Sequence, residues 1–235
     1  MSRKSKRNQR GPDNTEPDAG SFRRKWIVYA AVAAMVLAVV TGSLLYNKRE
    51  KSPAGTGAEQ AALASTQSPM LGDPAAKVHI VEFIDPACET CAVFFPLVKQ
   101  VIAENPGRLR LSIRHVAFHN GSDYVVRLLE ASRKQDKYWQ TLEALLASQA
   151  QWTANHTVQP ERVGLAIAGV GLNVEQLMTD MNSPDVAARI QQDANDAITM
   201  KVTATPEYFV NGRPLPSFGE QQLLTLIGEE LQRAY

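Results

Sequence analysis

The sequence has few residues that could cross-link a fold, since only two cysteines occur in 235 residues. At most one disulfide can therefore form within the chain. No internal repeat is visible, and the net charge is only +1. Residues 52–235 carry 14 Lys or Arg against 20 Asp or Glu, so this part lacks the basic surplus that would neutralise phosphates. We therefore expect no nucleic acid among the partners.

The positive charge is concentrated at the N-terminus instead. Residues 1–25 carry eight Lys or Arg against three acids and are otherwise polar, which predicts a disordered tail. The apolar fraction of the whole chain, 44%, is typical of a globular protein. The length allows one domain of ordinary size with appendages.

Residues 26–46 form an uncharged, strongly apolar run that is long enough to cross roughly 30 Å of hydrocarbon as a helix. Basic residues directly precede it, so the positive-inside rule places residues 1–25 in the cytoplasm and the remainder outside. A cleaved signal peptide is usually shorter and ends in a small-residue cleavage site, and a buried core helix seldom has such basic flanks. We predict a single-pass anchor in the inner (cytoplasmic) membrane, with a periplasmic or otherwise extracytoplasmic domain.

Residues 47–70 are small and polar and predict a flexible linker, so that the folded domain covers 71–235. A strand, a helix and a second strand are predicted first, followed by a helical block at about 121–200, a hairpin around Asn211-Gly212 and a last helix. The predicted ranges outside the block are 77–84, 88–104, 108–116, 207–210, 213–215 and 220–233. This order predicts an α/β fold with a helical insertion.

The two cysteines lie three residues apart, as Cys88-Glu89-Thr90-Cys91, where a strand gives way to a helix. Unpaired N–H groups and the positive end of the helix dipole favour an anion there, so the Cys88 thiol should ionise readily. Cys91 lies one turn further, on the same face, and could attack a mixed disulfide formed at Cys88. The pattern predicts a pair in which one cysteine attacks and the other resolves.

Three other interpretations of the cysteine pair remain open at this stage. A structural disulfide would close a very short loop and stabilise little. A zinc site could combine both thiols with His115 and His119, although the spacing is not that of a C2H2 finger. Two inert buried thiols are the third alternative. We interpret all four histidines, including His79 and His156, as structural or surface residues, and expect no cofactor and no metal.

Residues 70–235 resemble the DsbA-like branch of the thioredoxin superfamily. The resemblance depends on CETC after KVHIVEFIDPA, on Pro96 within the first helix, on VTATPEYFVNGRPL and on the place of the helical insertion. It implies a thioredoxin-like fold with catalytic Cys88 and Cys91. It also implies a cis bond between Thr205 and Pro206, facing the cysteines, where an extended substrate peptide pairs with the backbone.

Glu82 interrupts an apolar strand six residues before Cys88, where the resemblance implies a buried acid beneath the disulfide. A buried carboxyl group stays partly protonated and could transfer a proton to or from Cys91. The alternative is an exposed acid at a sheet edge. We predict a catalytic role for Glu82.

The sequence thus predicts a membrane-tethered thiol-disulfide oxidoreductase that acts on thiols of exported proteins or peptides, with a redox partner in the membrane or periplasm. The strongest oxidants of the family have Pro and His between their cysteines, where this chain has Glu89 and Thr90. We therefore expect a less oxidising potential. A disulfide reductase or isomerase, and a non-catalytic peptide-binding module, are the alternatives.

Overall fold

The computed structural model describes Ala34, Met35, Leu37 and residues 56–235. The chain divides into two units, Met1–Pro53 and Ala54–Tyr235, and the fold described here is that of the second. Apart from three residues, the predicted anchor at 26–46 lies outside the described residues, as do the tail at 1–25 and the first part of the linker. No helix among the described residues has the length and apolar character needed to cross a membrane.

A five-stranded sheet forms the centre of the domain, in the order β1-β3-β2-β6-β7. β2 and β3 are parallel, and the other neighbouring strands pair antiparallel. The strands are β1 (Met70–Gly72), β2 (Val78–Ile84), β3 (Leu109–His115), β6 (Glu207–Val210) and β7 (Arg213–Pro214). The predicted strands are confirmed to within one or two residues at each end.

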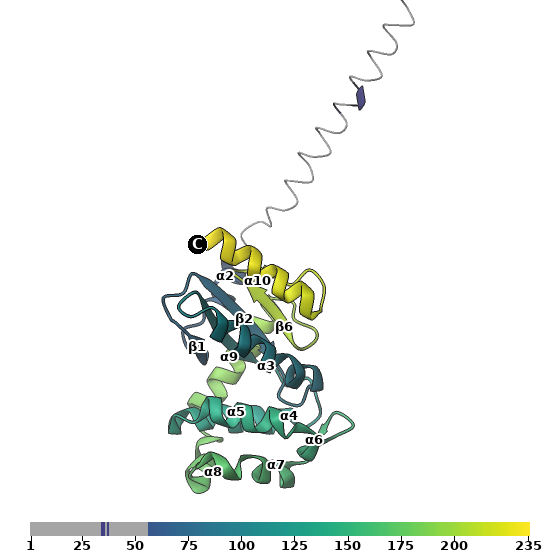
Figure 1. Ribbon diagram of the computed structural model, residues 1–235. Coiled ribbons are helices and arrows are strands. Elements are labelled where there is room, and N and C mark those ends of the chain that lie inside the picture. The colour runs from purple at the N-terminus through teal and green to yellow at the C-terminus, as the bar shows by residue number, and fades with distance from the viewer. Residues whose placement is uncertain (1–33, 36, 38–55) are drawn as a thin grey trace, which may run out of the picture. The chain divides into compact units, whose positions relative to one another are not determined.

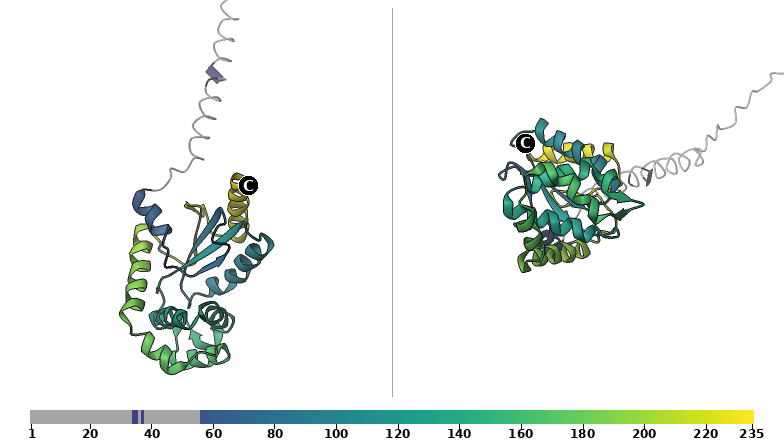
Figure 2. Two further views of the ribbon diagram at one scale, coloured as in Figure 1. Left: turned by 90° about the vertical axis from the view of Figure 1, so that its left-hand side faces the viewer. Right: turned by 90° about the horizontal axis from the view of Figure 1, so that it is seen from below.

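Helices cover both faces of this sheet (Figures 1 and 2). One face packs against α3 (Glu89–Glu104) and α10 (Glu220–Ala234), and the other against α9 (Pro184–Thr199) with α2 (Gly57–Leu63). β2 is buried on both faces because its side chains alternate between two cores: Ile80 and Ile84 enter the larger core, whereas Val81 and Phe83 enter the smaller one.

The chain between β3 and β6 forms the helical insertion, below the sheet in Figure 1. Its core contains the fully buried side chains of Trp152, Leu142 and Leu145. The elements before α9 are α4 (Ser122–Ser132), α5 (Tyr138–Ala147), α6 (Gln149–Trp152), α7 (Pro160–Ile167) and α8 (Val174–Asp180), with the hairpin β4 (Thr153–Ala154) and β5 (Thr157–Val158). The predicted α/β thioredoxin-like fold with a helical insertion is confirmed.

The segment expected to be a linker up to residue 70 differs from the prediction. Residues 57–63 form α2, which begins with a capping box between Thr56 and Glu59. Ala62 and Leu63 are both buried, and Leu63 packs in the smaller core. Small polar residues are typical of a tether, and two buried side chains in a two-turn helix give too weak an apolar pattern to outweigh that composition.

The buried face of α9 is more polar than its sequence predicts. Helical spacing predicts a buried apolar stripe of Val186, Ile190, Ala194, Ala197 and Ile198. Ile198 is 76% exposed, whereas Asp193 and Asp196 are buried. Both acids form ion pairs with the buried Arg114 of β3, at 2.6 Å between Arg114 Nε and Asp193 Oδ1. The spacing of apolar residues does not identify the buried face of α9, because this helix packs on the sheet partly through ion pairs with Arg114.

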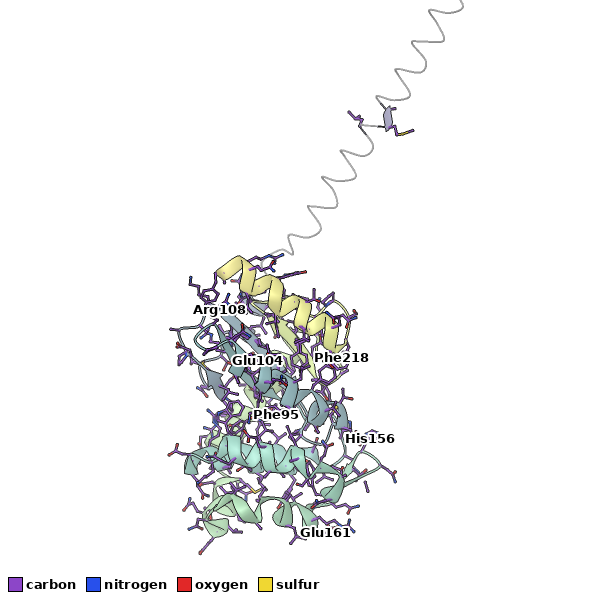
Figure 3. The ribbon with its side chains drawn as sticks, in the orientation of Figure 1. Phe95, Glu104, Arg108, His156, Glu161 and Phe218 are labelled. Atoms are coloured by element: carbon purple, nitrogen blue, oxygen red, sulfur yellow. The ribbon has the colours of Figure 1, made fainter. Side chains whose placement is uncertain are left out.

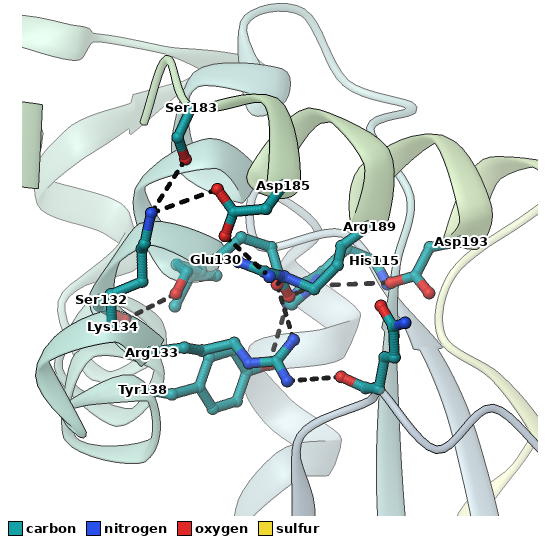
Figure 4. Close-up of polar contacts among 12 residues, drawn as sticks. His115, Glu130, Ser132, Arg133, Lys134, Tyr138, Ser183, Asp185, Arg189 and Asp193 are labelled. Carbon is teal, nitrogen blue, oxygen red and sulfur yellow. Dashed lines mark hydrogen bonds and ion pairs between the residues drawn. The ribbon is translucent and has the colours of Figure 1, made fainter. Parts of the chain in front are cut away.

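Next to the ion pairs of Arg114 lies a second set of polar contacts, which joins β3, α4 and α9 (Figure 4). Glu130 accepts hydrogen bonds from Arg133 and Arg189, and Glu130 Oε1 lies 3.2 Å from His115 Nδ1. The His115 Nε2 atom lies 2.9 Å from the hydroxyl of the buried Tyr138. These contacts attach the helical insertion to the sheet.

Candidate active site

The cysteines occupy the turn that connects the carboxyl end of β2 to α3. Cys88 is the N-cap residue of α3, and Cys91 lies within its first turn. Cys88 is 6% exposed and Cys91 is fully buried, and both are free thiols. Because β2 and β3 are parallel, their carboxyl ends meet at this edge of the sheet, where the insertion also begins.

The thiol of Cys88 is strongly acidified. A hydrogen bond from Cys91, together with contacts to Thr205 and to the backbone N–H groups of Thr90 and Cys91, lowers the pKa of Cys88 to about 5 despite partial burial. Unpaired N–H groups at the start of α3 supply part of this stabilisation. At neutral pH, Cys88 is therefore a thiolate.

Cys91 has the opposite character. Burial raises the pKa of Cys91 far above that of a free thiol, and the negative charges of Cys88 and Glu82 raise it further. Cys91 thus remains protonated and donates to the Cys88 sulfur. The pair is asymmetric, with one nucleophilic and one protonated sulfur.

Glu82 lies under this pair on β2, on the face that carries the larger core. It is fully buried, which confirms the expected burial and contradicts the edge-exposed alternative. Burial raises the pKa of Glu82, a hydrogen bond from Tyr208 lowers it by a smaller amount, and the charge of Cys88 raises it. The net pKa is about 8. Tyr208 donates to Oε1 at 3.0 Å, while Oε2 has no hydrogen-bond partner among the described residues.

Thr205 and Pro206 lie in the loop between α9 and β6, and the bond between them is cis. The carbonyl oxygen of Thr205 lies 3.2 Å from the Cys88 sulfur, a distance at which the Cys88 thiol donates to it when Cys88 is protonated. Thr205 is partly exposed and Pro206 is buried. The structure thus places this loop against the nucleophilic sulfur.

Sequence reasoning missed Asp85, a fully buried acid directly after β2. One of its oxygens accepts the N–H of Ala87 at 2.8 Å, and the other accepts the N–H groups of Phe118 and His119 at 2.7 and 2.9 Å. The Ser122 hydroxyl donates to it as well. Asp85 thereby ties the cysteine turn to the loop after β3. An acid between a buried strand and a proline was the one available signal.

Gln149 is the second residue that was missed. This buried side chain of α6 donates through Nε2 to the carbonyl oxygens of Pro86 and Cys88, at 2.7 and 3.0 Å. Since it lies 61 residues from Cys88, no local pattern could connect the two. It links the insertion to the active-site turn.

The zinc alternative with both thiols, His115 and His119 is wrong. The His115 ring lies between Glu130 and Tyr138 in the polar network of the insertion. Among the described residues, no group of three or more potential metal ligands contains either cysteine. The structural-disulfide alternative also fits poorly, because the acidified Cys88 thiol is suited to reaction.

A thioredoxin-like sheet, an asymmetric dithiol at a helix start and a cis-proline loop against the reactive sulfur define a thiol-disulfide oxidoreductase. A family model described as thioredoxin matches residues 64–228. The chain belongs to the thioredoxin family, and the place of its helical insertion makes it DsbA-like.

Relatives and solved structures agree with this family. The probable disulfide bond formation protein D of Bacillus cereus is 28% identical over 194 residues, which cover 79% of this chain and 86% of that protein. A thioredoxin-like oxidoreductase from Silicibacter pomeroyi is 29% identical, with a TM-score of 0.64 over 75% of this chain and 99% of that one.

A longer protein also contains a related region. The chain is 28% identical over 162 residues, or 69% of its length, to the Na(+)/H(+) antiporter NhaA of Herminiimonas arsenicoxydans. It spans 25% of the length of that curated relative.

Proposed function

We propose that the protein is a membrane-tethered, extracytoplasmic oxidoreductase that exchanges dithiols and disulfides on exported proteins through Cys88 and Cys91. The observation that carries the proposal is the contrast between the two sulfurs. Cys88 has a pKa of about 5 and touches the Thr205 carbonyl, whereas Cys91 is buried and protonated.

In the oxidising direction, a substrate thiolate attacks the Cys88 sulfur of the Cys88–Cys91 disulfide. The new bond joins substrate and Cys88, and Cys91 leaves with the electron pair. A second substrate thiolate then attacks the substrate sulfur of this mixed disulfide, and Cys88 leaves as a thiolate. Two electrons thus pass from the substrate to the enzyme. The low pKa of Cys88 makes its thiolate a good leaving group in the second step.

Glu82 is proposed to supply the proton that Cys91 takes up on leaving. With a pKa of about 8, this carboxyl group is mostly protonated at neutral pH. The charge interaction between Glu82 and Cys91 places the two groups in the same buried region. In the reverse direction the carboxylate would accept the proton from Cys91.

Thr205 and Pro206 are proposed to bind the substrate backbone. The Thr205 carbonyl lies beside the reactive sulfur. An extended peptide that pairs with Thr205 would therefore bring its own sulfur close to Cys88. Main-chain pairing tolerates many side chains, which suits an enzyme with diverse exported substrates.

The tether and the location are inferred from the uncharged run at 26–46 and the basic residues before it. The relative named for disulfide bond formation supports an oxidising environment. In that location, a redox partner in the membrane or periplasm would reoxidise the dithiol. Protease protection of residues 56–235 in intact spheroplasts would contradict this topology.

We infer that the disulfide is a milder oxidant than those of the strongest family members. The Cys88 thiolate, with a pKa of about 5, stabilises the reduced form more than an ordinary thiol would. The stabilisation is smaller than in DsbA, where the corresponding pKa is about 3.5. A potential near about −120 mV, the value for DsbA, would contradict this inference.

Insulin reduction and a redox titration with the full-length protein test the dithiol chemistry, and Cys88→Ser should abolish both signals. Alkylation trapping in cells tests the direction: a mostly disulfide population supports an oxidase, and a mostly dithiol population supports a reductase or isomerase. If Cys88→Ser leaves the cellular function intact, the protein is a peptide-binding module instead.

A further inference from the structure

Three potential metal ligands from separate segments meet beside the active-site turn. Glu89 is the first residue of α3, His119 follows β3, and His156 lies at the tip of the β4–β5 hairpin. One ligand atom from each lies within 4.8 Å of the other two. Figure 3 shows His156 at the margin of the helical insertion.

His156 already contacts the other two side chains. His156 Nδ1 lies 2.9 Å from Glu89 Oε2, and the rings of His119 and His156 stack with centroids 5.5 Å apart. A zinc ion with bonds of about 2.0–2.1 Å holds its ligand atoms roughly 3.3 Å from one another. The side chains of Glu89 and His156 are exposed and can rotate toward that spacing.

A buried carboxylate orients His119. Asp85 Oδ2 lies 2.8 Å from His119 Nδ1 and also accepts the backbone N–H of His119. Because Asp85 occupies Nδ1, Nε2 is the nitrogen that His119 offers to a ligand. Metal-binding histidines almost always have such a partner on their second nitrogen, which fixes the ring.

The hairpin that carries His156 is fixed against the loop that carries His119. The N–H of Val158 donates to the carbonyl oxygen of Asn120 at 2.9 Å, and Asn120 pairs with Thr157 in an isolated bridge. A Cβ atom at Gly121 would lie 3.2 Å from the Val158 Cβ, so the two segments are closely packed. Both histidine-bearing segments are therefore held together independently of their rings.

We propose that Glu89, His119 and His156 form a Zn²⁺ site. Two imidazoles and one carboxylate are a common zinc ligand set, and water would occupy the fourth position. A bound ion would connect the first turn of α3, which holds the cysteines, to the helical insertion. On this proposal His119 and His156 share a binding role, whereas the sequence predicts structural or surface residues.

The test uses the full-length, tag-free protein in its oxidised form, because the disulfide removes both thiolates as competing ligands. All four histidines and both cysteines of the chain lie in the described part, so no further His or Cys ligand lies outside it. Titration calorimetry should show one Zn²⁺ per chain. His156→Asn and Glu89→Gln should each weaken binding at least tenfold.

The variants are chosen to preserve the fold. His156 has φ 57°, a conformation that asparagine tolerates, and Gln keeps the shape of Glu89. Glu161→Gln, which changes an exposed acid at the start of α7, is the matched control and should retain wild-type affinity. Circular dichroism of each variant checks that it is folded.

Thermal unfolding gives a second measurement. Zn²⁺ should raise the Tm of the oxidised wild-type protein, because a ligand that binds the folded state stabilises it. It should not raise the Tm of the double variant His156→Asn/Glu89→Gln. Equal Zn²⁺ affinity of the wild-type protein and the double variant would overturn the site. Insulin reduction without zinc measures the dithiol chemistry separately.

Discussion

Tyr208 and Glu82 face each other on neighbouring antiparallel strands, and the Tyr208 hydroxyl donates to Glu82 Oε1 at 3.0 Å. Both side chains are fully buried on the sheet face that carries the dithiol. The hydrogen bond fixes one carboxyl oxygen and leaves the other without a partner among the described residues. A carboxyl group held in this way can gain or lose a proton without moving, as a proton shuttle requires.

Glu82→Gln tests this proton transfer. The amide can still accept from Tyr208 but cannot exchange a proton with Cys91. We expect the step in which Cys91 leaves or attacks to slow at least tenfold, since positioned acid-base groups contribute about 10² to 10⁴. The inflection near pH 8 should disappear. Stopped-flow thiol exchange across pH measures both, and an unchanged profile would remove Glu82 from the mechanism.

The same variant should change the pH dependence of stability. The folded pKa of Glu82 is about 8, above its ordinary value of 4.5, so between these pH values the folded protein holds a proton that the unfolded chain releases. Stability from this group is present below pH 4.5 and is lost as pH rises through 8. In the oxidised protein at pH 9, the free energy of unfolding of Glu82→Gln should exceed that of wild type by about 1–3 kcal/mol. This range allows for the cost of one unpaired amide N–H in the variant. Urea denaturation at several pH values measures this difference.

The pKa contrast between the cysteines predicts selective alkylation. Iodoacetamide should modify only Cys88 in the reduced protein, at a rate that is constant near pH 7 and falls below a midpoint of about 5. Cys91 should stay unmodified because its pKa is raised. Mass spectrometry after timed quenching identifies the site. A midpoint above pH 7 would show that the helix start does not stabilise the thiolate.

The elements around the site could be predicted because each depends on a local pattern. An apolar run gave β2, alternation gave β3, and the Cys88–Cys91 spacing at a strand-to-helix junction gave the dithiol. Glu82 was identified because a lone acid in an apolar strand is unusual.

The remaining contacts could not be predicted because their partners are distant in sequence. Arg114 and Asp193 are 79 residues apart, and each alone looks like an ordinary surface charge. Asp85 is similar, since its role depends on N–H groups that lie 33 and 34 residues away. Burial of charge is decided by tertiary pairing, which a single sequence does not display.

Arg114→Ala should destabilise the protein strongly. Asp193 and Asp196 would stay buried without their cation, a change that costs roughly 3–5 kcal/mol. Lys99→Ala is the matched control, since its pair with Glu143 is 37% and 45% exposed and should contribute at most about 1 kcal/mol. Urea unfolding of both variants measures the contrast. Similar losses would mean that the α9 acids find other partners.

Gln149→Ala should impair catalysis without touching a reacting atom. The carbonyl oxygens of Pro86 and Cys88 would lose their buried donor, at a cost of roughly 1–3 kcal/mol. The turn that aims the Cys88 sulfur would then be held less firmly, and misplacement of reacting groups slows reactions by about tenfold or more. Gln151→Ala, two residues along and exposed, is the control. Insulin reduction and urea unfolding should show a slower, less stable Gln149→Ala and an unchanged control. If the Gln149→Ala rate matches wild type, the insertion does not position the cysteine turn.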